Sequence, residues 1–535
     1  VAMEEPLPVK QIEMEQVASE MLYDYYEVKI TSPYTRVCYY FRLEDDTESL
    51  YYYGRGFAEK LSCGRAEYFQ FPYIRREDIL DIPEWAEDIV MYHIFPDSFA
   101  NDRRKLTEKA TRHMLLPDGK SDSNGKILPD RICKNHLGGT LKGICENLDY
   151  IEKLGINCIY LNPIFEAASY HKYDTIDYFE IDPCLGNKAD LKELVQQCHK
   201  RGIRVILDGV FNHVGRGFYQ FQDVLKNREN SRYKDWFHIS FEGNSNYNDG
   251  LWYEGWEGNY DLVKLNLGNE EVVQHILNAV KFWIDEFDID GIRLDVAYCL
   301  SPEFLHRLRN YCDGLKNDFF LVGEMLHGDY NQRMNDSMLH SATNYECYKG
   351  LYSSFNSMNM FEICHSLNRQ FGAENWTIYK GKHLFSFVDN HDVTRVASIL
   401  SNENHLPLIY TLMFGMPGIP CVYYGSEWGE KADKSQGDQA LRPSFEQPIE
   451  NELFKHISKL ADIKKNSTAL NYGDFSTILL TNKQCVIKRC VDTETVLVCI
   501  NADENNFYAN FNVSANCIDL LTNKELRVEN GFEME

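Results

Sequence analysis

The sequence predicts an α/β protein: a (β/α)8 TIM barrel with an inserted subdomain after strand 3, a partial N-terminal β domain and a C-terminal β-sandwich. Three observations carry this prediction. Strand-like apolar runs alternate with helical patterns along the middle of the chain, as in repeated βα units. Ionisable side chains follow several of these runs, as expected where parallel strands end on one rim. One segment between two runs is too long for a βα loop, which predicts the inserted subdomain.

Charge and hydropathy exclude two classes of function. The 535 residues carry a net charge of −26, and binding to nucleic acid or to an anionic membrane needs a basic face. No apolar run approaches the roughly 20 residues of a membrane span. The 16 cysteines are scattered without a C-x-x-C pair. That pattern indicates free thiols in a reducing compartment, and therefore a cytoplasmic protein.

Three domains are expected along the chain. Residues 1–82 begin with a polar, irregular stretch over residues 1–20 and continue with short Tyr- and Val-rich runs, typical of antiparallel strands. The pattern changes near Trp85, so the barrel is assigned to residues 83–464. Short strands resume in residues 465–535. The expected strands of the two outer domains are Tyr23–Ile30, Arg36–Leu43, Leu50–Tyr53, Thr477–Leu480, Cys485–Arg489 and Val496–Asn501.

The barrel domain contains eight expected strands with helical patterns between them. The clearest helices are Lys188–His199, Glu270–Phe287 and Glu303–Leu315. The inserted subdomain, about residues 215–269, carries three tryptophans among Gly, Asn and Asp residues. The expected barrel strands are Ile89–Phe95, Cys158–Asn162, Arg204–Val210, Ile292–Ala297, Phe319–Gly323, a weak one at Ser341–Tyr345, Leu384–Val388 and Ile419–Tyr424.

The fourth strand carries the motif around which the site is organised. Arg293 and Asp295 stand two residues apart, so in a strand they share one face while Ile292 and Leu294 take the other. An adjacent guanidinium keeps a carboxylate ionised, and an ionised, well-placed carboxylate can act as a nucleophile. For an isolated R-x-D motif, a structural ion pair at a strand end is the more common explanation.

Three further strands end in the same manner. Strand three ends at Asp208, strand five at Glu324, and strand seven is followed by Asp392. Each acid alone would more often cap or pair locally. Together they favour glycoside hydrolysis, in which one carboxylate attacks the anomeric carbon and another protonates the leaving oxygen. The acid should have a pKa raised by burial and by Asp295, while Arg293 should keep Asp295 ionised.

These motifs, D-x-x-x-N-H, G-x-R-x-D, a strand-final Glu and F-x-x-N-H-D, resemble in this order the four signature regions of the α-amylase family (glycoside hydrolase family 13). The resemblance implies that Asp295 is the nucleophile, Glu324 the general acid/base and Asp392 a third acid that holds sugar hydroxyls. The segment Tyr170–Tyr173 resembles a sugar-binding segment after strand two. The residues implied to bind the cleaved sugar or shape its rim are Arg293, His213, His391, His171, Tyr173, Asp208 and Asn212.

Smaller sequence features resemble those of the neopullulanase, cyclomaltodextrinase and maltogenic amylase group. They are Lys264 in L-V-K-L-N, and His327 three residues after the acid. Asp438 and Arg442 match a pair that in this group holds the second sugar on the non-reducing side; a loop salt bridge between the two is an equal alternative. The usual calcium loop after strand one is replaced by Arg103–Lys105, and cations repel a metal. No cofactor and no metal site are therefore expected.

The resemblance implies a retaining hydrolase of α-1,4 bonds in maltooligosaccharides, cyclodextrins or pullulan, with α-1,6 bonds left open. A 4-α-glucanotransferase on the same scaffold is the main alternative, because both share the covalent intermediate and differ in what resolves it. A non-catalytic binding subunit is the third, and the presence of all three acids speaks against it. The expected partner is an α-glucan, without nucleic acid or membrane; a homodimer is left open.

Overall fold

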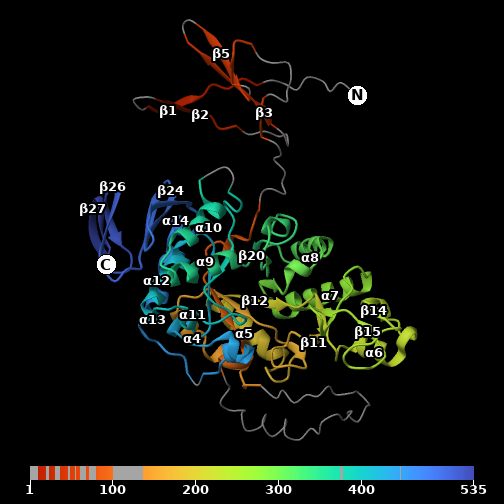
Figure 1. The fold of residues 1–535 in the computed structure, drawn as a ribbon. Coiled ribbons are helices and arrows are strands. Elements are labelled where there is room, and N and C mark those ends of the chain that lie inside the picture. The colour runs from red at the N-terminus through yellow and green to blue at the C-terminus, as the bar shows by residue number, and fades with distance from the viewer. Residues whose placement is uncertain are drawn as a thin grey trace. The chain divides into compact units, whose positions relative to one another are not determined.

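Eight parallel strands form the centre of the larger of two units into which the chain divides, Val1–Ile79 and Leu80–Glu535. The structure is a computed structural model (Figure 1). The residues that it describes are 10–19, 23–30, 37–45, 48–54, 56–60, 68–71, 80–100, 136–373, 377–445 and 447–534.

The eight strands close into a barrel. Each pairs in parallel with its neighbour, and the sheet order is β20-β19-β18-β12-β9-β8-β22-β21. A parallel bridge between Thr343 and Phe385 joins the two ends of this order. The predicted (β/α)8 fold is confirmed. The strands are β8 (Met91–Ile94), β9 (Cys158–Leu161), β12 (Arg204–Gly209), β18 (Gly291–Leu294), β19 (Phe320–Gly323), β20 (Ser341–Ala342), β21 (Phe385–Phe387) and β22 (Ile419–Tyr423).

Two predicted strand ends are wrong. Beyond Leu294 the chain leaves the strand, because Val296 has left-handed backbone angles of φ 40° and ψ 47°. The weak sixth strand ends at Ala342, and Asn344 caps the helix that begins at Tyr345 by accepting from the backbone N–H of Cys347. In both places a functional rim follows the strand, and local turn chemistry overrides the apolar pattern there.

Alternating side chains separate the barrel interior from the layer that faces the helices. Ile292 and Leu294 pack in the outer layer, as predicted from the alternation around Arg293. Interior positions are apolar early in a strand and polar at its carboxyl end, so the polar groups collect at one rim. The series run Met91 then His93 on β8, Cys158 then Tyr160 on β9, and Ile206 then Asp208 on β12.

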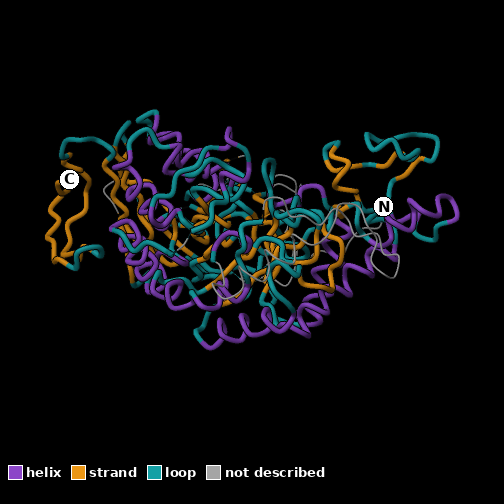
Figure 2. The backbone as a smooth tube through the Cα atoms, turned by 90° about the horizontal axis from the view of Figure 1, so that it is seen from below, coloured by secondary structure: helices purple, strands orange, loops and turns teal. Residues whose placement is uncertain are grey.

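Helices surround the barrel, and Figure 2 shows strands in the middle of this unit with helices outside them, while the C-terminal strands lie at the edge near the label C. The longest, α7 (Glu270–Phe287), begins with the Asn269 side chain as its cap and ends at Asp288, which has a positive φ. Among the described residues no helix is long and apolar enough to cross a membrane. The other helices are α1 (Pro96–Phe99), α3 (Leu141–Glu146), α4 (Leu148–Lys153), α5 (Lys188–Lys200), α6 (Tyr219–Asn227), α8 (Pro302–Leu315), α9 (Tyr345–Asn356), α10 (Phe361–Phe371), α11 (Val396–Ile399), α12 (Leu406–Gly415), α13 (Glu452–Asn466) and α14 (Thr468–Tyr472).

The subdomain inserted between β12 and α7 contains α6 and small antiparallel sheets, and Figure 1 shows it beside α7. Its first strand pairs with its last, so that His213 lies opposite Lys264. A short hairpin of β10 (Phe165–Ala167) and β11 (Thr175–Ile181) follows β9. The strands of the insert are β13 (His213–Gly215), β14 (Ile239–Ser240), β15 (Trp252–Tyr253), β16 (Gly255–Trp256) and β17 (Asn259–Lys264).

Two sheets at the C-terminus pack face to face around Val486, Ala509, Val528 and Met534. The three predicted strands form the first sheet, and the hairpin of the second was not predicted. Arg489 connects this region to the barrel: its guanidinium donates to the backbone oxygens of Gly473 and Gly415, which end α14 and α12. The strands are β23 (Asp474–Leu480), β24 (Gln484–Val491), β25 (Glu494–Asn501), β26 (Phe507–Asp519) and β27 (Lys524–Met534).

The smaller unit consists of short antiparallel strands, as predicted. The irregular start predicted for residues 1–20 is wrong in part, because Glu15–Ser19 forms strand β1 and pairs with β2. Aromatic side chains hold the sheets: Tyr52 stacks on Phe57 with ring centroids 4.7 Å apart. The strands are β1, β2 (Asp24–Glu27), β3 (Val37–Tyr39), β4 (Phe41–Glu44), β5 (Ser49–Tyr53), β6 (Gly56–Ala58) and β7 (Phe69–Phe71).

Candidate active site

One guanidinium binds three carboxylates at the carboxyl rim of the barrel. Arg293 Nη1 lies 3.0 Å from Asp208 Oδ1 and 3.0 Å from Asp295 Oδ1. Its Nη2 lies 2.9 Å from Glu324 Oε1. All four side chains are buried, and they come from the ends of three adjacent strands, β12, β18 and β19. The strand-end acids that the sequence singled out are therefore neighbours.

The shared guanidinium corrects one expectation. The sequence assigned Arg293 to Asp295 alone, but the structure places it equally against Glu324. Burial raises the pKa of both Asp295 and Glu324, and Arg293 lowers both without offsetting the burial. The negative charge of Glu324 raises the pKa of Asp295 further. Such a pair favours one shared proton, which is the state that a nucleophile and an acid require together.

The backbone that follows Asp295 also contacts Glu324. Val296 N–H donates to Glu324 Oε2 at 2.9 Å. A branched side chain disfavours the left-handed angles of Val296, so this conformation costs about 1–3 kcal/mol that the surrounding fold must offset. The strained residue thus connects Asp295 to Glu324 through the backbone.

Asp392 lies in a separate, cationic environment. Its Oδ2 is 3.0 Å from His391 Nε2, and its Oδ1 is 2.9 Å from Arg442 Nη2. Burial would raise the pKa of Asp392, but His391, Arg442 and Arg293 lower it by more, so its pKa falls well below the usual range. The pKa of Asp392 is thus lowered while that of Glu324 is raised, so the two carboxyl groups favour opposite protonation states.

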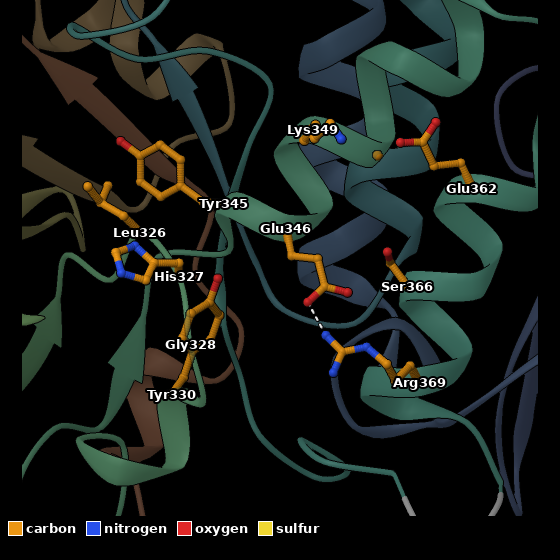
Figure 3. Close-up of a pocket in the computed structure, with 11 residues that line it drawn as sticks. Leu326, His327, Gly328, Tyr330, Tyr345, Glu346, Lys349, Glu362, Ser366 and Arg369 are labelled. Atoms are coloured by element: carbon orange, nitrogen blue, oxygen red, sulfur yellow. Dashed lines mark hydrogen bonds and ion pairs between the residues drawn. The ribbon is translucent and has the colours of Figure 1, made fainter.

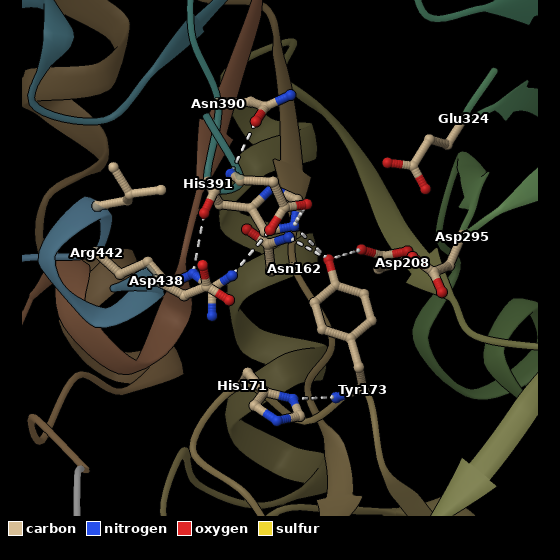
Figure 4. A network of polar contacts seen from close by, with 12 residues as sticks. Asn162, His171, Tyr173, Asp208, Asp295, Glu324, Asn390, His391, Asp438 and Arg442 are labelled. Atoms are coloured by element: carbon tan, nitrogen blue, oxygen red, sulfur yellow. Dashed lines mark hydrogen bonds and ion pairs between the residues drawn. The ribbon is translucent and has the colours of Figure 1, made fainter. Parts of the chain in front are cut away.

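Tyr173 connects these two groups of acids. Figure 4 shows its hydroxyl between Asn162, Asp208 and His391. The oxygen lies 2.9 Å from Asp208 Oδ2 and 2.7 Å from His391 Nε2. His171 Nδ1 accepts from the Tyr173 backbone N–H at 3.1 Å, and burial lowers the pKa of His171. Both residues of the predicted segment after strand two reach the rim.

His213 is a neutral, buried imidazole. Its Nδ1 lies 3.2 Å from Asn212 Nδ2, and its Nε2 lies 3.9 Å from Asp295 Oδ2. Burial lowers the pKa of His213 to about 3, so it offers a hydrogen bond rather than a charge. Lys264 lies opposite His213 in the insert, and its half-buried ammonium forms an ion pair with Glu254.

The structure separates Asp438 from Arg442. Asp438 is exposed, and its Oδ1 lies 2.6 Å from Lys434 Nζ. Arg442 is buried and donates to the Tyr170 hydroxyl and the His391 carbonyl besides Asp392. The loop salt bridge between Asp438 and Arg442 that the sequence left open is not formed, and sugar binding by the two residues stays a prediction.

His327 is exposed on a pocket beside the acid. The pocket, of about 450 Å³, lies between the loop after β19 and helices α9 and α10 (Figure 3). An ion pair between Arg369 and Glu346 lies at the helix side. The remaining lining residues are Leu326, Gly328, Tyr330, Tyr345, Lys349, Gly350, Glu362 and Ser366.

Several site residues were missed by the sequence analysis. His93, Tyr160 and Asn162 line the rim from β8 and from the end of β9, and Tyr170 binds Arg442. The signal was available in the alternation, since Tyr160 follows Cys158 on the inward face and is followed by Asn162. Arg103–Lys105, on which the calcium prediction depends, lie outside the described residues.

Comparison with known proteins gives consistent matches. A family model described as "Alpha amylase, catalytic domain" matches residues 93–452, and one described as "Alpha amylase, N-terminal ig-like domain" matches residues 2–75. A cyclomaltodextrinase of Geobacillus thermopakistaniensis is 35% identical over 91% of this chain and 81% of its own length. An intracellular maltogenic amylase of Bacillus subtilis is 34% identical over the same shares.

Solved structures agree in fold. A cyclomaltodextrinase structure superposes with a TM-score of 0.75 at 30% identity, covering 97% of this chain and 90% of its own.

Proposed function

The chain belongs to the α-amylase family, and on this basis we propose that it cleaves short α-1,4 glucans and cyclodextrins with Asp295 as nucleophile and Glu324 as acid/base. It is a retaining glycoside hydrolase, the class of its relatives. The observation that carries the assignment of roles is the guanidinium of Arg293, which holds the two carboxyl groups at one place on the rim.

The reaction proceeds in two displacements. Asp295 attacks the anomeric carbon, and Glu324 gives its proton to the glycosidic oxygen of the leaving chain. Glu324, now a carboxylate, takes a proton from water, which attacks the covalent glucosyl ester and releases the sugar with retained configuration. Asp392 is held by His391 and Arg442 and binds hydroxyls of the reacting sugar. Asp208 and Tyr173, which are hydrogen-bonded to each other, line the bottom of the site below the reacting sugar.

The substrate class follows from the relatives that are named cyclomaltodextrinase and maltogenic amylase. We propose maltotriose, cyclodextrins and pullulan as substrates. The test is to incubate the protein with each and to separate the products by chromatography over time. Glucose and maltose from these substrates support the proposal; no cleavage of any of the three would contradict it.

A transferase is the second candidate, because the pocket lined by Leu326 and His327, which follow Glu324 closely in the chain, gives room for an acceptor sugar. The time course on maltotriose separates the two: transfer produces oligosaccharides longer than maltotriose, whereas hydrolysis of this substrate does not. A cytoplasmic location is also proposed, since all 14 cysteines that the structure describes are free thiols and two relatives are named intracellular.

A further inference from the structure

The Tyr173 hydroxyl has three polar neighbours but only one proton to give. Asn162 Nδ2 lies 2.9 Å from it, and Asn162 comes directly after β9 and before Pro163, which restricts its backbone to extended angles. Asp208 Oδ2 and His391 Nε2 are the other two neighbours. A phenolic hydroxyl donates one hydrogen bond and accepts two.

The chemistry of the neighbours fixes where this proton goes. The amide nitrogen of Asn162 only donates, and the carboxylate of Asp208, paired with Arg293, only accepts. Tyr173 must therefore donate to Asp208 and accept from Asn162. The remaining contact is satisfied only if His391 Nε2 carries a proton, which is also what its 3.0 Å contact with Asp392 requires.

His93 sets the orientation of the Asn162 amide, because it contacts the amide oxygen. The His93 Nε2 lies 2.6 Å from Asn162 Oδ1, and its ring stacks on Tyr160 at 4.4 Å. Burial lowers the pKa of His93 well below its usual value, so the ring is neutral, and the contact of Nε2 with the amide oxygen of Asn162 assigns the single N–H to Nε2. An amide oxygen bound to this N–H leaves the amide nitrogen facing Tyr173.

We propose that Asn162, oriented by His93, is a positioning residue that fixes the hydrogen-bond directions of Tyr173 and, through them, the protonated Nε2 of His391 that faces Asp392. The chain of contacts runs His93, Asn162, Tyr173, His391 and Asp392, and at its end the single Nε2–H of His391 is shared between the Tyr173 oxygen and the Asp392 carboxylate. This inference rests on the proposed function, because it explains how the rim is held ready for the sugar.

The decisive variant is Asn162→Asp, which keeps the oxygen that faces His93 and turns the donor facing Tyr173 into an acceptor. A loss of about tenfold to a hundredfold in kcat on maltotriose is expected at pH 8, the effect of one buried mispaired group. The loss should shrink toward pH 5, because the new buried carboxyl gains a proton and donates again. The groups that face this position are His93, Tyr160, Tyr173, Asp208 and His391.

Two controls separate positioning from folding. In the Tyr173→Phe background the same substitution should cost less than about threefold, because the hydroxyl on which Asn162 acts is gone. Gln484→Glu makes the same chemical change at a buried amide in β24, where the partner is Asn501, and should lower the melting temperature without changing kcat. An undiminished loss in the Tyr173→Phe background would overturn the proposal.

A measurement without turnover distinguishes this inference from the proposed function. Nitrogen-15 NMR of the unliganded parent should show the His391 ring protonated at Nε2, with the signal assigned by its absence in His391→Gln. An Nε2 without a proton would overturn the inference even if the enzyme cleaves maltotriose. A protonated Nε2 in a protein that cleaves no α-glucan would instead contradict the proposed function alone.

Discussion

At the residue scale, Arg293 decides how the acids behave, because it is one cation shared by three carboxylates. Removing one carboxylate therefore has two effects: it reduces the repulsion among the carboxylates, and it removes a chemical group. The consequences of a substitution at Asp295 therefore differ for activity and for stability, and both can be measured.

Asp295→Asn should lower kcat on maltotriose by at least about three orders of magnitude, because an amide cannot form the covalent ester. The melting temperature should stay equal or rise, since a buried carboxyl with a raised pKa is replaced by a neutral group of the same shape. Chromatographic rates and a thermal scan test both parts. Full activity would remove Asp295 from the nucleophile role, and a large drop in melting temperature would indicate a structural ion pair.

Arg442→Ala should lower kcat/KM for maltotriose and for an activated monosaccharide glucoside alike, by about thirtyfold or more. The reason is that Arg442 binds Asp392 and the His391 carbonyl, which serve the reacting sugar itself.

Asp438→Asn is the matched comparison, because Asp438 is exposed and pairs with Lys434. It should leave the monosaccharide glucoside unaffected. A loss confined to maltotriose in Arg442→Ala would show that Arg442 acts on the more distant sugar and not through Asp392.

The sequence predicts those site residues that belong to local strand-end motifs. Asp208, Arg293, Asp295 and Glu324 end strands whose alternation is readable, and the structure brings them together. The partners of Arg442 were not predictable, since Asp392 and Arg442 are 50 positions apart and meet through a loop. Asn162 was read only as the end of a strand, because nothing local shows that His93 faces it.

At the scale of elements, the cores of all eight barrel strands were predicted. Seven are short apolar runs flanked by turn residues, and the weak sixth, Ser341–Ala342, was predicted without such a run. The ends were not, because Val296 and Tyr345 are apolar or aromatic residues whose conformation is set by the rim. The hairpin of β26 and β27 was missed since its inward residues, such as Ala509 and Cys517, alternate with polar ones on a weakly apolar face.

Arg489 gives a prediction at this scale. Its buried guanidinium satisfies the carbonyls that end α14 and α12, so Arg489→Met leaves Gly473 and Gly415 without these donors. We expect a loss of about 2–4 kcal/mol in the free energy of unfolding, measured by urea denaturation. Activity at a temperature below the transition should stay within about twofold of the parent, because the guanidinium binds the ends of α14 and α12 rather than the residues at the carboxyl rim of the barrel.

Arg527→Met is its control, because Arg527 is exposed on β27 and its ion pair with Glu529 lies at the surface. It should change stability by less than about 0.5 kcal/mol. Equal effects of the two substitutions would mean that Arg489 contributes through its charge rather than through the two helix ends.

At the scale of the whole molecule, burial lowers the pKa of nine of the histidines that the structure describes, to about 4 for His136 and His383 and about 3 for His213. The other six are His93, His171, His275, His340, His405 and His456. In the unfolded chain a histidine titrates near 6.5. The unfolded state therefore binds more protons between about pH 6.5 and 4, and stability must fall as the pH falls through this window.

We expect the melting temperature to be highest above pH 6.5 and to decrease steadily toward pH 4. Glu427 opposes this trend, because burial raises its pKa to about 7 and its folded form binds the extra proton. Thermal scans at intervals of half a pH unit test the sign. His383→Asn should flatten the decrease, whereas substitution of the exposed His365 by Gln should not; a melting temperature that rises on acidification would contradict the assignment.

The excess of carboxylates over guanidinium groups at the rim has a consequence for inhibition. Asp208, Asp295, Glu324 and Asp392 share two guanidinium groups, those of Arg293 and Arg442, and Asp392 also faces His391. A sugar analogue with a protonated ring nitrogen supplies the missing positive charge in the place where the reacting sugar develops it. Such an amine should bind at least about tenfold more tightly than its uncharged counterpart, a difference of about 1.4 kcal/mol. Calorimetric titration with the two analogues measures this preference, which should weaken as the amine loses its proton at high pH.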